Sequence, residues 1–398
     1  MTLRPRSVLL AFACVSAALP ALAGEPAPAF RSSHAAPAAP APVSGYTFGL
    51  LHAFNGADGT CPLGRLIRGA DAAWYAVASE GGAAGAGTVW RLGDDGSLST
   101  LHTFDPAVDG SAPNGLVLAT DGNFYGVAKG SGHPAIAGIV YKLTPQGVFS
   151  VLHTFRPTEI PNEIIQGKDG ALYGTTPWTG LVYRLTLDGR YKVLLTIDEN
   201  AASAPVELVG ALAEGAPGTF YGQSVLGGST FHGTVYQVAR GGVLTVLHSF
   251  LGDPDGQWPT AGPTVAPDGS LVGTTSDGGT LAGVLWAITT EGRYGYLIPW
   301  PADDSRGAFP GAPLTFDRYV TAFGTTLNAR VDGDYSAAGT LYQVRHQVLT
   351  VLHTFAPDGS EGTGQDAPLT IGDDGAIYGM SCRDGPLGGG TVYRLQPQ

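Results

Sequence analysis

The sequence predicts an all-β protein, a seven-bladed β-propeller whose blades are four-stranded antiparallel sheets. Three observations support this prediction: a repeat of about 50 residues, a composition that suits tight turns, and a start and end that are out of phase with the repeat. The chain has 398 residues, of which 60 are glycine, 29 are proline and only 14% are charged. Glycine and proline favour turns, and we find no long stretch with helical periodicity.

Each repeat contains four short strands, which we name a to d in chain order. Strand b follows a turn and carries an aromatic-glycine pair, with the clearest copies at residues 121–126, 169–174 and 374–379. A glycine-rich loop leads to strand c, and an Asp-Gly turn such as 95–96 or 188–189 joins strands c and d. This turn is a two-residue hairpin signal. Four strands with this period describe a propeller blade.

Two further landmarks set the phase of the repeat. Strand c has an aromatic residue at one fixed place in all seven copies: Trp90, Tyr141, Tyr183, Tyr236, Trp286, Tyr342 and Tyr393. Strand d ends in Leu-His-x-Phe at 51–54, 101–104, 152–155, 247–250 and 352–355, with degenerate copies at 194–197 and 297–300. Since a ligand site would not need seven copies, we interpret the strand-c aromatics as core residues that pack between blades.

The two ends of the repeat region complement each other. The repeats begin with a lone d strand at residues 46–54 and end with a lone c strand at 390–395. Pairing these segments completes the seventh blade and leaves it without an open edge. We therefore expect one propeller domain over residues 46–398.

Residues 1–23 have the features of a signal peptide. Arg4 and Arg6 precede an apolar run at 7–19, and Ala-Leu-Ala at 21–23 is a small-x-small cleavage site. No other apolar segment is long enough to span a bilayer. The sequence therefore predicts an exported protein, periplasmic or extracellular.

Two alternatives accompany this assignment. A competing interpretation makes Cys14 a lipid-attachment site, although the apolar stretch continues past it. Residues 24–45 are rich in proline and alanine, so we expect an extended spacer; a tail without a role is the alternative.

The formal net charge is −12, and losing two arginines with the signal peptide makes it −14. A chain this acidic is a poor partner for nucleic acid.

The combined pattern over about residues 46–398 resembles the GloVer-type repeats of exported bacterial proteins, described as "choice-of-anchor" because members carry differing C-terminal anchors. The resemblance implies export and a repeat-built β domain, and it carries no established activity or catalytic residues. This chain departs from the anchored members because it stops at Gln398, shortly after strand c, with no sorting motif or terminal membrane helix. The resemblance therefore does not imply attachment to a surface here.

Cleavage of the signal peptide would leave two cysteines, Cys61 and Cys382. Cys61 follows the N-terminal d strand, and Cys382 lies in the b–c loop of the last blade. The d–a and b–c connections of a blade emerge on the same face, which we name the loop face, so the two cysteines can meet where the ring closes. Export favours disulfides. We expect a Cys61–Cys382 disulfide; two free thiols are the alternative.

The recurrent histidines invite a metal hypothesis, which their period argues against. They are His52, His102, His153, His248 and His353. Each occupies the same place in a different blade, so the ring symmetry spreads them around the rim and no three can converge on one ion. We expect each to make hydrogen bonds within or between blades, and we assign no metal site to them.

The d–a loops carry carboxylates that form a candidate acidic ring on the loop face: Asp58, Asp105, Asp109, Asp198, Glu199, Asp253, Asp255, Asp303, Asp304, Asp358 and Glu361. Such loops could supply some of the six to eight oxygens that Ca²⁺ takes. No stretch matches a complete calcium loop, however. Surface solvation is the simpler interpretation, and we expect no cofactor.

Function should lie where the repeats differ, in the loops. The candidate ligand-binding residues are Trp178, Trp258, Tyr335, Asp332, Asp334 and Arg383. Aromatic faces beside carboxylates can stack on sugar rings; scattered loop residues without a role are the alternative. The catalytic candidates are the loop histidines His133 and His232. No esterase elbow, zinc-protease motif, P-loop or paired-cysteine motif occurs in the sequence.

These observations favour an exported binding or scaffold module, a monomer that recognises a polysaccharide, peptide or envelope protein through its loop face. The alternative is a propeller lyase or hydrolase acting on an extracytoplasmic polymer, because convergent loop carboxylates and histidines leave no local motif. A purely structural envelope protein is a third hypothesis, favoured if the loop face has no pocket.

Overall fold

The computed structural model describes residues 45–130, 138–278, 283–300, 307–331, 334–336 and 339–398. Within these ranges every regular element is a β-strand. No helix that could cross a membrane occurs among them. The predicted signal peptide and spacer, residues 1–45, lie outside the described part except for Gly45, so their assignments stay predictions.

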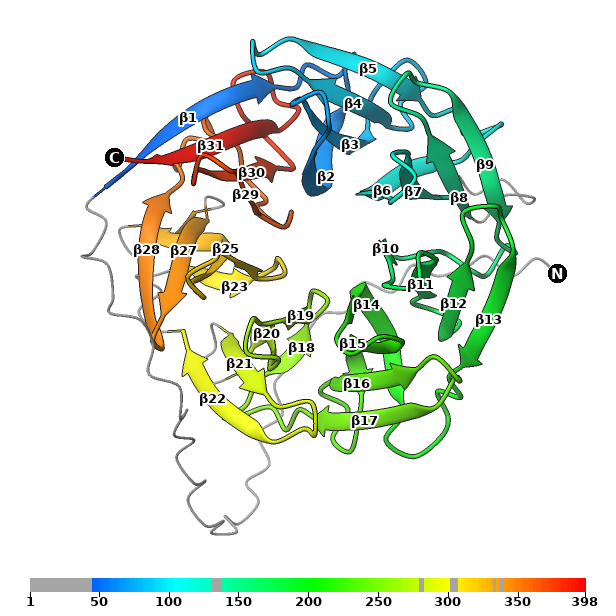
Figure 1. Cartoon of the computed structure of the whole chain (residues 1–398). Coiled ribbons are helices and arrows are strands. Elements are labelled where there is room, and N and C mark those ends of the chain that lie inside the picture. The colour runs from blue at the N-terminus through cyan, green and yellow to red at the C-terminus, as the bar shows by residue number, and fades with distance from the viewer. Residues whose placement is uncertain (1–44, 131–137, 279–282, 301–306, 332–333, 337–338) are drawn as a thin grey trace, which may run out of the picture. The chain divides into compact units, whose positions relative to one another are not determined.

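The strands form seven sheets arranged in a ring (Figure 1), which confirms the predicted seven-bladed propeller. Blades 1 to 3 each have four strands: β2 (Thr60–Arg68), β3 (Trp74–Glu80), β4 (Thr88–Leu92) and β5 (Leu98–Thr103); β6 (Ser111–Leu118), β7 (Phe124–Lys129), β8 (Gly138–Leu143) and β9 (Phe149–Thr154); β10 (Ile164–Gln166), β11 (Leu172–Thr176), β12 (Leu181–Leu185) and β13 (Tyr191–Thr196).

Blades 4 to 6 continue the pattern, with strand a split in two in blades 5 and 6. Their strands are β14 (Pro205–Glu214), β15 (Thr219–Gly227), β16 (Thr234–Ala239) and β17 (Leu244–Ser249); β18 (Gln257–Pro259), β19 (Thr264–Val265), β20 (Leu271–Asp277), β21 (Val284–Ile288) and β22 (Tyr294–Pro299); β23 (Ala308–Pro310), β24 (Thr315–Phe316), β25 (Ala322–Val331), β26 (Asp334–Ser336), β27 (Thr340–Arg345) and β28 (Val348–Thr354).

Blade 7 joins the two ends of the repeat region. It consists of β29 (Thr370–Ile371), β30 (Ile377–Ser381), β31 (Thr391–Pro397) and β1 (Tyr46–Ala53). Strand β1 pairs antiparallel with β31 from Tyr46↔Pro397 to Ala53↔Thr391, and the blue and red strands lie side by side in Figure 1. The N-terminal strand therefore closes the ring, as the sequence predicts.

The strand-c aromatics are buried, and the aromatic-glycine pair of strand b makes room for them. All seven rings have at most 1% exposure. A Cβ added to Gly126 would lie 2.3 Å from the Tyr141 hydroxyl. The equivalent glycines of blades 3 to 7 leave the same space for the strand-c aromatic of their own blade. Gly126 has no positive φ, so the glycine is needed for space and not for backbone freedom. In blade 1, Ala76 is the register partner of Trp90.

The hydrophobic core lies between blades. Seven buried clusters each combine residues of two neighbouring blades. The phenylalanine of Leu-His-x-Phe contacts the strand-c aromatic of the next blade: Phe104 lies 5.4 Å from Tyr141, and Phe155 lies 5.2 Å from Tyr183. Edge-to-face aromatic pairs of this kind add stability beyond their buried area. The period of the aromatics is therefore the period of inter-blade packing.

The Asp-Gly turn between strands a and b is held by its aspartate. The Asp121 carboxylate accepts hydrogen bonds from the Asn123 backbone N–H, at 3.1 Å, and from the Tyr125 hydroxyl, at 2.8 Å. Partial burial disfavours the charged form, but bonds from Asn123, Tyr125 and Lys142 outweigh it and lower the pKa of Asp121 to about 2. Tyr75 with Asp71, Tyr173 with Asp169 and Tyr378 with Asp374 repeat the contact. The aromatic of the repeat therefore anchors its own turn.

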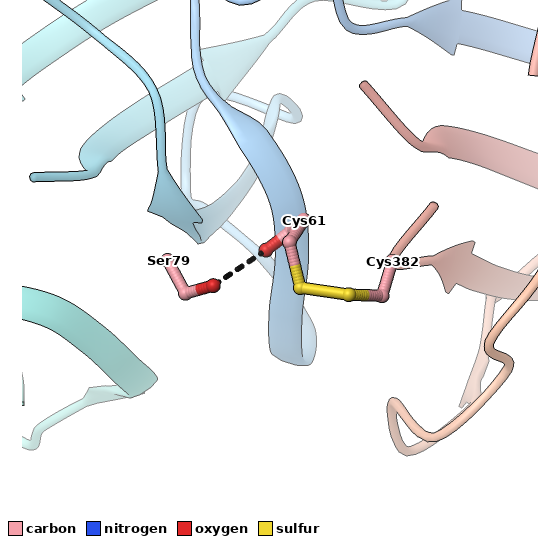
Figure 2. Close-up of a disulfide and its surroundings, with 3 residues drawn as sticks. All are labelled: Cys61, Ser79 and Cys382. Atoms are coloured by element: carbon pink, nitrogen blue, oxygen red, sulfur yellow. Dashed lines mark hydrogen bonds between the residues drawn. A yellow bond between two sulfur atoms is a disulfide. The ribbon is translucent and has the colours of Figure 1, made fainter. Parts of the chain in front are cut away.

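A disulfide links the first and last blades (Figure 2). Cys61 in β2 bonds to Cys382, which directly follows β30, with an S–S distance of 2.01 Å. The Ser79 hydroxyl donates to the Cys61 carbonyl at 3.3 Å. Since the cysteines are 321 residues apart, the bond covalently supports the closure that β1 and β31 make by hydrogen bonds.

Replacing Gly126 by alanine should lower the stability by about 3 kcal/mol, because the new Cβ overpacks the core against Tyr141. Chemical denaturation followed by circular dichroism measures the effect. Gly241→Ala is the matched control, because Gly241 is exposed, has no positive φ and has no atom within 4 Å of an added Cβ. A Gly126→Ala midpoint equal to that of the control would contradict the packing argument.

Reduction of the disulfide should lower the stability by about 2–5 kcal/mol, because the closed loop is long and the unfolded chain gains freedom when it opens. The thermal midpoint with and without a phosphine reductant measures this. In the Cys61→Ala/Cys382→Ala double variant the reductant should have no further effect, which separates the disulfide from other actions of the reagent. An unchanged midpoint of the parent protein after verified reduction would refute the prediction.

Candidate functional site

Most of the histidines on the outer strands pair with carboxylates of the following d–a loop. The Nε2 distances are 2.9 Å for His52–Asp58, 2.7 Å for His102–Asp109, 2.9 Å for His248–Asp255 and 2.8 Å for His353–Glu361. His102 also stacks on Phe149 of the next blade, with ring centroids 3.8 Å apart. These histidines and acids therefore fasten each loop to its own blade, a role that the six- to eight-residue spacing between them could have revealed.

His153 departs from this pattern. It stacks on Tyr191 with centroids 3.8 Å apart. Burial lowers its pKa, and the nearby Glu159 opposes this shift. Its contact therefore joins blades 2 and 3 through a ring stack.

The acidic ring does not form a metal centre within the described residues. Four of its members, Asp58, Asp109, Asp255 and Glu361, are hydrogen-bonded to histidines. In the part of the chain that the structure describes, no group of three or more His, Cys, Asp or Glu side chains could hold a metal ion. Asp303 and Asp304 lie outside that part. Hydrogen bonds to histidines, more than solvation of the surface, therefore explain why these four positions carry acids.

Blade 3 differs from the repeat at two places beside a pocket. Leu195 stands where five other blades have the histidine and blade 5 has Ile298, so the carboxylates that follow β13 have no such partner. The connection between β11 and β12 spans only residues 177–180, whereas residues 81–87 join the equivalent strands of blade 1. A cavity of about 390 Å³ lies here, lined by Trp178, Thr179, Thr196, Ile197, Asp198, Glu199 and Asn200. We name it the Trp178 pocket.

The Trp178 pocket combines an aromatic wall with two carboxylates. Trp178 is 61% exposed, and Ile197 is buried, with its N–H donating to the Gly180 carbonyl at 2.9 Å. Asp198 accepts the Asn200 backbone N–H at 3.1 Å. The Glu199 carboxylate makes no hydrogen bond or ion pair within the described ranges, and burial, followed by repulsion from Glu207, raises its pKa. The pocket is therefore open, acidic and able to accept hydrogen bonds.

Two other predicted ligand-binding residues, Trp258 and Arg383, do not line the Trp178 pocket. Trp258 lies in β18 of blade 5, where its backbone N–H donates to the His232 carbonyl at 3.0 Å. Arg383 follows the disulfide in blade 7 and exchanges backbone hydrogen bonds with Thr363. Trp178, Trp258 and Arg383 thus belong to three different blades, and the assignment of Trp258 and Arg383 to ligand binding stays a prediction.

The remaining predicted residues can be placed only in part. His232 is half-buried beside Trp258, and its Nδ1 is buried without a hydrogen-bond partner in the described region. Tyr335 and Asp334 lie in β26, paired with Arg330 and Val331 of β25. His133 and Asp332 lie outside the described residues, so the pairing of His133 with His232 stays a prediction.

A second cavity of about 350 Å³ lies at the centre of the ring. The strands nearest the centre in Figure 1 line it, together with residues just before β24 and β29. Three charged side chains stand on an otherwise mostly apolar wall. The Glu214 carboxylate accepts the backbone N–H groups of Lys168 and Gly218, whereas Arg65 and Glu163 occupy the equivalent position of strand a in blades 1 and 3. Sequence reasoning missed both, although aligning strand a of the seven repeats would have shown charges where other blades have glycine, alanine or proline.

The fold is similar to that of solved propellers of several functions. Virginiamycin B lyase from Staphylococcus aureus matches with a TM-score of 0.62 and 13% identity, over 88% of this chain and 99% of that chain. A streptogramin B lyase matches with a TM-score of 0.62 and 15% identity, over 89% and 99%. The extracellular domain of a protein assigned to the hybrid two-component systems of B. thetaiotaomicron matches with a TM-score of 0.60 and 10% identity, over 89% and 41%. At these identities the likeness concerns the fold alone.

Sequence comparison defines the family more closely than fold does. No curated protein matches the chain. The Gloeobacter/Verrucomicrobia repeat matches residues 41–177 and 134–336, which together cover more than half of the chain and several of the blades described above. The chain belongs to the family of Gloeobacter/Verrucomicrobia repeat proteins.

Proposed function

We propose that this chain is an exported binding module that recognises a neutral or amino-sugar glycan at the Trp178 pocket. The observation that carries the proposal is the exposed Trp178 ring beside Asp198 and Glu199, in a cavity at the short connection between β11 and β12 of blade 3. The cavity size, about 390 Å³, falls in the range of small-ligand sites.

The chemistry of the pocket suits a saccharide. A sugar ring presents an apolar face that can stack on an exposed indole, whose body is apolar and rigid. Its hydroxyl groups can donate to the carboxylates of Asp198 and Glu199, which act as acceptors when ionised. Two carboxylates repel uronic acids and attract an ammonium group, so the pocket favours neutral sugars and amino sugars over acidic ones.

Export is supported by the disulfide between Cys61 and Cys382, because stable disulfides belong to oxidising compartments such as the periplasm and the cell exterior. The predicted signal peptide at residues 1–23 agrees with this location. A periplasmic or extracellular protein meets envelope polysaccharides directly.

A hydrolase or lyase acting on an extracytoplasmic polymer is the second candidate. The observation that favours it is Glu199, whose pKa is raised beside a second carboxylate, Asp198. Glycosidases use a carboxylic acid of raised pKa together with a neighbouring carboxylate. Virginiamycin B lyase, similar in fold, is an enzyme on such a propeller.

Replacing Trp178 by alanine should weaken binding of the best glycan at least about tenfold, since the stacking surface is lost. Isothermal titration of the protein with neutral, amino-sugar and uronate oligosaccharides measures the affinities. Phe231→Ala is the matched control: Phe231 is 63% exposed and lies between the b and c strands of blade 4. It should leave the affinity unchanged.

Two outcomes would decide against the proposal. Equal weakening by both aromatic substitutions, or preference for uronate oligosaccharides, would remove the Trp178 pocket as the site. Incubation of the bound glycan with the protein tests the second candidate: release of products that stops in Glu199→Gln, while binding persists, would assign an enzyme.

A further inference from the structure

The central cavity is lined by one equivalent position from every blade. The residue that starts each a–b turn donates its N–H to the carbonyl four residues later, as in Gly69→Ala73 and Gly167→Ala171. Counting back four residues from this shared turn defines the innermost position of strand a: Arg65, Gly115, Glu163, Ala211, Gly262, Pro313 and Pro368. All seven line the cavity. The ring therefore supplies seven matched wall positions.

Five of these positions carry glycine, alanine or proline, and two carry charges. The fold does not require a charge at the position, because five blades are built without one. Arg65 is exposed to the cavity and Glu163 is half-buried. Arg65 and Glu163 form no ion pair with each other within the described residues, so each charge can take a partner from a ligand in the cavity.

Arg65 is anchored at one nitrogen and free at the others. Its Nη1 donates to the Leu369 carbonyl at 2.8 Å and to the Thr315 hydroxyl at 3.2 Å, so the side chain reaches toward blades 6 and 7. Nε and Nη2 make no hydrogen bond within the described part of the chain. Burial lowers the pKa of Arg65 and Glu163 opposes the shift. An arginine in a protein stays protonated, and its unused N–H groups match a carboxylate.

Glu163 lies on the other side of blade 2. Its side chain occupies the space that Gly115 leaves, since a Cβ at Gly115 would lie 3.0 Å from the Glu163 Cγ. The carboxyl group makes no hydrogen bond or ion pair among the described residues. Burial raises its pKa, and Arg65 and Lys129 oppose this shift. A cationic group and a carboxyl group thus face the same 350 Å³ cavity with unused hydrogen-bonding capacity.

We propose that the central cavity binds a free α-amino acid with an apolar side chain, its carboxylate on Arg65 and its ammonium group on Glu163. A ligand with one negative and one positive group offers a partner of opposite charge to both Arg65 and Glu163, whereas an acid or an amine alone would satisfy only one of them. The remaining wall of glycine, alanine, proline, Val117 and Ile165 suits an aliphatic side chain. This site is separate from the Trp178 pocket, and it does not rest on glycan recognition.

Titration calorimetry with leucine, 4-methylpentanoate and 3-methylbutylamine tests the proposal, because the two analogues lack the amino group and the carboxylate respectively. Leucine should bind the protein at least about tenfold more tightly than either analogue. Arg65→Met and Glu163→Gln should each weaken leucine binding by a similar factor. Lys129→Met is the control, since Lys129 bears a charge near Glu163 without lining the cavity, and it should change the affinity less than about twofold.

Ala211→Leu provides a test that alters neither charge. Ala211 lines the cavity, and the larger side chain should exclude leucine while thermal unfolding shows that the ring is intact. This variant decides the matter if Arg65→Met does not fold. Absence of leucine binding, equal binding of 4-methylpentanoate, or binding that survives Ala211→Leu would overturn the proposal. Trp178→Ala should leave leucine binding unchanged.

Discussion

The contact between the phenylalanine that ends strand d and the strand-c aromatic of the next blade is the interaction on which the ring depends. Phe54 lies 5.5 Å from Trp90, and Phe355 lies 5.0 Å from Tyr393. Each ring of strand c lies over a glycine or alanine of strand b in its own blade. A single blade cannot bury both sides of its sheet by itself. Each buried cluster is therefore formed by residues of two neighbouring blades.

Closure follows from the same constraint. A ring of blades that each need two neighbours leaves no stable end, so the seventh blade is completed by β1 from the start of the repeat region. Phe48 of β1 stacks on His353 of blade 6 at 4.7 Å and on Tyr393 at 5.7 Å. The Cys61–Cys382 disulfide adds a covalent link between blades 1 and 7. Closure thus repeats the inter-blade contact with a segment far away in sequence.

Positions where the blades differ do not take part in the aromatic contacts between blades. The short connection between β11 and β12 in blade 3 carries the exposed Trp178 beside the carboxylates of Asp198 and Glu199. At the innermost position, Arg65 and Glu163 replace small residues. Substitution at such places costs the fold little, and concave sites on rigid elements suit ligand binding. The regular repeat therefore supplies a scaffold, and its exceptions supply the candidate chemistry.

The sequence by itself determined the seven blades, the closing strand and the inward aromatics, because each depends on local period and on residue type. The pairing of Cys61 with Cys382 also followed, since the phase of the repeat puts both on the loop face. Only the tertiary structure decided that Trp178 and Glu199 share a pocket that Trp258 and Arg383 do not line, and that Arg65 and Glu163 face one cavity. These relations depend on side-chain directions and on contacts across blades, which no linear spacing encodes.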